Sequence, residues 1–92
     1  MAEIIPYQTK LTNGVGTITG TVALRSYNSS RQSLMIQNLG SGTLYLGGST
    51  VDTTTGLQVL PHGDITLDNS QGAAVYCTAD GTCNIRFLEE IL

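Results

Sequence analysis

Charged side chains are scarce in this sequence: four Lys and Arg and seven Asp and Glu make up 12% of its 92 residues. This is about half the usual share. Disordered chains combine low hydrophobicity with high charge, so the composition excludes a disordered chain. A weakly charged surface also repels its neighbours little, which suits a subunit packed in an assembly. The four basic residues are scattered and the net charge is −3, so we expect no nucleic-acid partner.

Long apolar runs are missing as well. No stretch approaches the roughly 18 consecutive apolar residues that span a bilayer, so we expect no membrane partner. The first ten residues, MAEIIPYQTK, lack the basic start and apolar centre of a secretory signal. The sequence therefore predicts a chain that is made in the cytoplasm and reaches any outside location as part of something larger.

Side chains that carry chemistry are few. The one histidine, His62, falls in a Pro-His-Gly turn with no fixed nucleophile or acid beside it, and the only cysteines are Cys77 and Cys83. A zinc site needs about four ligands, so we expect no metal site. Because no catalytic or cofactor-binding motif is present, we also expect no cofactor and no enzyme activity. Tryptophan is absent, which weighs against sugar binding. The lack of convergent polar groups weighs against a small-molecule ligand in general. Tyr27 and Tyr45 remain open as ligand contacts.

What the chain does contain is a series of short apolar runs separated by breaks rich in Gly, Ser, Asn or Pro. Each run is too short for a helix and rich in Leu, Ile, Val and Thr, which predicts strands. We expect them at 17–24, 33–38, 43–47, 57–60, 64–68, 73–79 and 82–89. Such strands fold into an all-β, antiparallel sandwich of jelly-roll type. Residues 17–92 are the predicted sandwich domain, and residues 1–16 an extended N-terminal arm or edge strand.

The alternation of apolar positions predicts the core and the turns. The predicted core is Leu34, Ile36, Leu46, Leu60, Ile65, Leu67, Val75, Ile85 and Phe87. Several of the turn glycines should have positive φ, because glycine adopts this conformation at no steric cost. These glycines are Gly40, Gly48, Gly56, Gly63 and Gly81.

Cys77 and Cys83 lie on the apolar face of the last two runs. With Gly81 in the left-handed position of a tight turn, a hairpin places the two cysteines directly opposite each other. A strained cross-strand disulfide is geometrically possible. Unbonded, buried thiols that act as small hydrophobic side chains are favoured in a reducing cytosol.

The segment from Arg31 to Glu89 resembles small structural proteins of tailed bacteriophages. The matching positions are Leu34, Ile36, Gln37, Asn38, Gly40, Tyr45-Leu46-Gly47-Gly48, Val51, Gly56, Leu60, Pro61, Gly63, Leu67, Val75-Tyr76 and Ile85-Arg86-Phe87-Leu88-Glu89. The resemblance implies a compact β-sandwich without catalytic residues. It implies a virion structural protein, in the first place a capsid decoration (cement) protein that stabilises the head shell. The alternative is a tail-fibre or baseplate module for host attachment.

On this interpretation the partners are the major capsid protein and further copies of the chain, as a homotrimer, in a virion assembled in the host cytoplasm. A cement protein stabilises the shell by binding only its assembled form. Ile4, Ile5 and Tyr7 are the predicted assembly contacts, because these apolar side chains need a docking surface.

Overall fold

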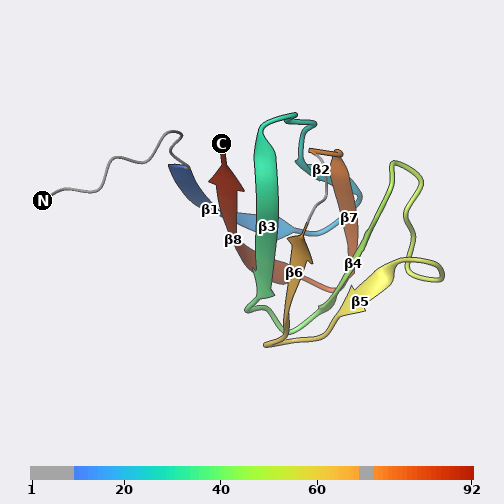
Figure 1. The fold of residues 1–92 in the computed structure, drawn as a ribbon. Coiled ribbons are helices and arrows are strands. Elements are labelled where there is room, and N and C mark those ends of the chain that lie inside the picture. Colours follow the sequence, from blue (N-terminus) through green and yellow to red (C-terminus); the bar gives the residue numbers. More distant parts are fainter. Residues whose placement is uncertain (1–9, 69–71) are drawn as a thin grey trace, which may run out of the picture.

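The computed structural model describes residues 10–68 and 72–92, which form eight strands and no helix (Figure 1). All observed strand pairs are antiparallel. The strands are β1 (Lys10–Ile18), β2 (Val22–Arg25), β3 (Arg31–Asn38), β4 (Thr43–Gly47), β5 (Leu57–Val59), β6 (Asp64–Asp68), β7 (Val75–Asp80) and β8 (Cys83–Ile91).

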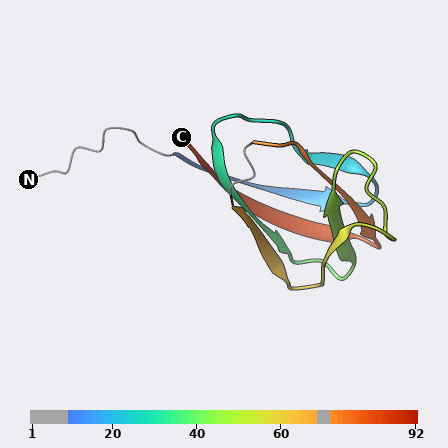
Figure 2. The same ribbon diagram turned by 45° about the vertical axis from the view of Figure 1, so that its right-hand side comes forward.

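Two four-stranded sheets pack face to face. We call the sheet with strand order β1-β8-β3-β6 sheet A and the sheet with order β2-β7-β4-β5 sheet B. Each strand is followed by one in the opposite sheet except where β4 and β5 are adjacent in sheet B. This order is the double Greek key of a jelly roll, which confirms the predicted fold class. Figure 2 shows β1 and β8 running side by side along the domain.

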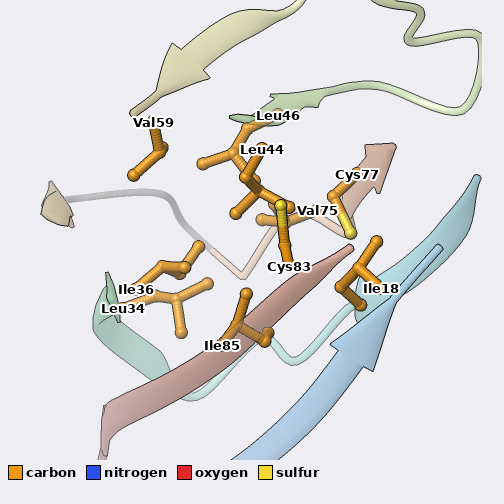
Figure 3. Close-up of a cluster of buried hydrophobic side chains, with 10 residues drawn as sticks. All are labelled: Ile18, Leu34, Ile36, Leu44, Leu46, Val59, Val75, Cys77, Cys83 and Ile85. Carbon is orange, nitrogen blue, oxygen red and sulfur yellow. The ribbon is translucent and has the colours of Figure 1, made fainter. Parts of the chain in front are cut away.

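The core lies between the sheets (Figure 3). Five of the predicted core residues are buried, and Ile65, Leu67 and Phe87 pack against the cluster from its margin. Leu60 was predicted wrongly: it directly follows β5 and its side chain is 59% exposed. The buried cluster consists of Ile18, Leu34, Ile36, Leu44, Leu46, Val59, Val75, Cys77, Cys83 and Ile85.

The predicted hairpin of β7 and β8 is also wrong, because these strands belong to different sheets. Cys77 pairs in register with Val22 and Leu46 in sheet B, whereas Cys83 pairs with Ile18 in sheet A. The chain crosses the sandwich after Asp80, so both thiols still point into the core, now from opposite sides. Alternation shows which face of a strand is buried, but a hairpin and a crossing between sheets give the same pattern.

The turn glycines have a different role from the one predicted. Of the five, Gly81 alone has a positive φ, at 89°; Gly72, outside that set, has φ 77°. At Gly40 the reason for glycine is close approach. A Cβ there would lie 2.6 Å from the backbone nitrogen of Asn84 and 2.7 Å from Cα of Cys83. Glycine at this position lets the β3–β4 connection pass directly against the start of β8.

His62 takes the conformation expected of a glycine, with φ 65°. It occupies the third position of the turn from Leu60 to Gly63, in which the amide of Gly63 donates to the carbonyl of Leu60 at 2.8 Å. A type II turn needs positive φ at this position and favours proline before it. The side chain of His62 is exposed.

A β-bulge near the start of β3 buries a charged side chain. The pairing of β3 with β8 shifts register between Arg31 and Ser33, so Arg31 and Leu34 both point inward although they are three residues apart. The bulge adds one residue on β3 and thereby reverses the alternation at this point. Arg31 is 2% exposed.

Glu89 is the centre of a buried ionic network at this end of the sandwich. Its Oε2 accepts from Nε of Arg31 at 2.8 Å, and its Oε1 accepts from Nη2 of Arg25 at 2.7 Å. Arg31 also donates to the carbonyls of Ala73, at 2.8 Å, and of Ser26. The network therefore joins β8 to the connections that enter β3 and β7.

Candidate functional site

Four exposed apolar side chains gather on the outer face of sheet A. Leu11 and Val15 on β1 are 68% and 76% exposed, Leu88 on β8 is 41% exposed and Met35 on β3 is 44% exposed. The neighbouring side chains on these strands, such as Ile85, alternate inward to the core. The inward-facing and the outward-facing side chains include similar apolar residues. Only the order of strands in the sheets therefore decides which of them form the core and which form this outer cluster.

Strand register brings the four side chains together. Leu88 pairs with Asn13 on one side and with Met35 on the other. Leu11 and Val15 flank Asn13 on the same face of β1, which makes them the diagonal neighbours of Leu88. We call these four residues, Leu11, Val15, Met35 and Leu88, the outer apolar patch.

Charged side chains stand on both sides of Leu88. Arg86 and Glu90 are the next outward-facing residues of β8, and both pair with patch residues of β1: Arg86 with Val15 and Glu90 with Leu11. The far edge of the face, on β6, carries Asp64 and Asp68. The apolar patch is thus accompanied by one positive and one negative group on its central strand.

An open hollow of about 390 Å³ adjoins the patch. Its walls include Val15, Thr17, Asn84 and Arg86 on β1 and β8, and Leu39 closes it at the end of β3. Such a hollow beside exposed apolar side chains has room for a side chain from another molecule.

Part of the outer face of sheet B, in contrast, is covered by the chain itself. Tyr45 points outward from β4 and is nevertheless 8% exposed. The connection of residues 48–56 closes over it: a Cβ on Gly56 would lie 2.7 Å from Cβ of Tyr45, and Val51 in the same connection is also buried. Tyr45 is therefore largely covered, whereas Tyr27 is 68% exposed.

Asp52 holds this covering connection in shape. Its Oδ1 accepts from the backbone amides of Thr54 and Thr55 at 2.9 and 2.8 Å, and from the hydroxyl of Thr55 at 2.9 Å. The hydrogen bonds from Thr55 and then from Thr54 lower the pKa of the Asp52 carboxyl. This connection shields Tyr45 on sheet B, whereas the outer apolar patch on sheet A is exposed.

Cys77 and Cys83 are unbonded and fully buried, as predicted. Burial, and to a lesser degree the neighbouring Cys83, raises the pKa of the Cys77 thiol to about 11. Burial also raises the pKa of Cys83, against a hydrogen bond with Asn38. Thiols of this kind stay protonated at neutral pH and react poorly.

The described residues contain no cluster of three or more His, Cys, Asp or Glu that could hold a metal ion. Within the same part of the chain there is no helix of the length and apolarity needed to cross a membrane. The predicted assembly contacts Ile4, Ile5 and Tyr7 lie outside the described residues. Residues 10–16, assigned from the sequence to an arm or edge strand, lie in β1.

No protein-family model and no curated protein matches this chain. A solved structure does match, described as "Bacillus endospore appendages form a novel family of disulfide-linked pili". The match covers 99% of this chain and 96% of the other, with 12% sequence identity and a TM-score of 0.47.

The prediction of a phage capsid decoration protein, with its alternative of a tail-fibre or baseplate module, is contradicted: the structural match is to a bacterial endospore appendage. The resemblance that suggested a phage protein consists of turn glycines and core positions such as Gly40 and Leu34. These residues specify how a small β-sandwich packs, and sandwiches of one architecture serve many unrelated functions.

Proposed function

We propose that this protein is a non-catalytic structural subunit that associates with further copies of itself through the outer face of sheet A. The observation that carries the proposal is the outer apolar patch, four apolar side chains in register on a face that residues 10–68 and 72–92 leave exposed. Contiguous exposed apolar side chains with polar residues around them mark protein contact sites.

The charges beside the patch favour a second copy as the partner. Consider two copies that pack with the outer faces of their A sheets together, related by a two-fold axis that runs across the strands along the row of Leu88 and Met35. Glu90 of each copy then lies opposite Arg86 of the other. Leu11 then faces Val15 of the second copy. A self-complementary arrangement of this kind is what a two-fold interface requires. The acidic residues of β6 would face one another, which confines the contact to β1, β8 and β3.

The contact is non-covalent on this proposal. The sequence has two cysteines, and both are fully buried in the folded domain. The folded chain therefore has no thiol at its surface for a disulfide to a neighbour. Two of its four basic side chains, Arg25 and Arg31, are bonded to Glu89, which leaves little positive charge for nucleic acid.

Sedimentation velocity over a range of protein concentrations tests the proposal. We expect the wild-type protein to associate, and Leu88→Lys to raise the dissociation constant at least tenfold, or about 1.4 kcal/mol, because a charge would be buried in the contact. Leu57→Lys and Leu60→Lys are matched controls, since these leucines are 53% and 59% exposed away from the patch. The trimer expected from the sequence stays a prediction that this measurement addresses.

A wild-type protein that sediments as a monomer at all concentrations would contradict the proposal. So would equal weakening of association by Leu88→Lys and by the control variants. Circular dichroism of each variant establishes that the fold is retained.

A further inference from the structure

The four edge strands of the sandwich differ in how well they are protected against pairing with another strand. Natural proteins protect edges with short strands, bulges, prolines and charged side chains. In this fold β2 has four residues and a bulge, β5 has three residues, and β6 has five residues with Asp at both ends. Each of these edges carries at least one such protection.

The edge strand β1 carries almost none. It has nine residues, pairs with β8 over its full length without a register shift, and contains no proline. Its one charged residue is Lys10, at its first position. In the described part of the chain β1 is paired on one side only, so its other side presents a row of unpaired backbone N–H and C=O groups.

We infer that β1 is a strand-addition site for β1 of a second copy, so that two A sheets join edge to edge into one continuous antiparallel sheet. The inference rests on the proposed function, because it names a contact through which the subunit assembles. Main-chain hydrogen bonds supply the affinity in strand addition, and the side chains select the partner.

The residues of β1 fit an antiparallel copy of themselves. With Asn13 on the two-fold axis, Leu11 lies opposite Val15 of the second copy, an apolar cross-strand pair on the outer face. On the inner face Thr12 lies opposite Gly14, and Lys10 opposite Gly16. No like charges meet in this register.

The edge contact would also extend the outer apolar patch. Leu11 and Val15 stand on the edge strand itself, and Leu88 stands on its neighbour. Edge pairing places the two patches beside each other on one sheet surface. The edge axis is normal to the sheet at Asn13 and the face axis runs along the row of Asn13, Leu88 and Met35, so the two axes cross at a right angle. A subunit with two such two-fold contacts assembles into a closed group of four copies.

Engineered cysteines test the pairing, because the two natural thiols are buried. Strands paired edge to edge have Cα atoms about 4.5–5.5 Å apart, within the range of a disulfide, whereas face-to-face sheets lie about 10 Å apart. Asn13→Cys in the full chain, oxidised with diamide, should therefore form a covalent dimer only in the edge contact. Diamide takes up the two electrons and two protons that the thiols lose.

Thr17→Cys is the matched control, exposed on the same face of the same strand. In the inferred register its two copies are eight residues apart along the strands, roughly 27 Å. We expect at least about tenfold more dimer from Asn13→Cys than from Thr17→Cys, since a disulfide forms according to the effective concentration of its thiols.

Equal dimer yields from the two variants would overturn the inference. So would preferential cross-linking of Asn13→Cys to Ile5→Cys in a mixture, which would assign the N-terminal segment of a neighbour to this edge. Cross-linking of Asn13→Cys that persists with Leu88→Lys supports the edge contact even where the face contact fails. If Asn13→Cys gives no cross-linked dimer but still associates in sedimentation velocity as the wild type does, the edge contact alone is overturned.

Discussion

Replacing Glu89 with alanine should lower the free energy of unfolding by about 3–5 kcal/mol, measured by urea denaturation, because it leaves two arginines without their anion. The carboxylate is fully buried and bonded to Arg25 and to Arg31. Arg31 is itself buried, so water cannot replace the lost partner. The loss would be a large share of the stability of a domain of this size.

Glu89→Gln is the matched variant, since it keeps the size of the side chain and removes its charge. We expect it to be less stable than the wild type and more stable than Glu89→Ala. Equal stability of all three proteins would contradict a stabilising role of the network.

The same network predicts how stability depends on pH. Burial by itself would raise the pKa of Glu89, but hydrogen bonds from Arg25 and Arg31, and their charges, outweigh it and lower the pKa below its usual 4.5. A lowered pKa in the folded state adds stability that is present above pH 4.5 and is lost as the pH falls through the folded-state value. The wild type should lose stability more steeply than Glu89→Gln below pH 4.5.

Gly40→Ala should destabilise the domain by about 3 kcal/mol, at the upper end of what overpacking costs, because the new methyl group meets backbone that cannot rotate away. A Cβ at Gly40 would lie within 2.7 Å of atoms of Thr82, Cys83 and Asn84. The backbone here is held by Asn38, whose side-chain Nδ2 donates to the carbonyls of Gly42 and Val59 at 2.9 and 3.0 Å.

Gly48→Ala is the control, because a Cβ there has no neighbour within 4 Å and Gly48 has no positive φ. We expect its free energy of unfolding to be unchanged or slightly higher. A Gly40→Ala variant as stable as Gly48→Ala would show that the β3–β4 connection can move away from β8.

The patterns that are local in the chain were predicted well. Runs such as Leu34–Ile36 and Leu44–Leu46 alternate with turn residues and therefore predict strands, and the left-handed turn at Gly81 follows from glycine's freedom at positive φ. The inward direction of both cysteines is also a property of alternation alone.

Features that depend on a partner distant in the sequence were missed. Nothing near Arg31 indicates that it is buried, because its partner Glu89 is 58 residues away and a bulge turns it inward. The sequence does not predict the outer apolar patch for the same reason, since Leu88 and Met35 become neighbours only through strand pairing.

The sequence by itself determined that this protein is a β-sandwich, because strand length, alternation and turn residues are properties of neighbouring residues. The tertiary structure alone decided which apolar side chains form the core and which, such as Val15 and Leu88, remain outside. It also decided that β7 and β8 lie in opposite sheets and that β1 is an edge strand of sheet A. Alternation assigns each side chain to one of two faces, but only the order of strands in a sheet decides what each face and edge meets.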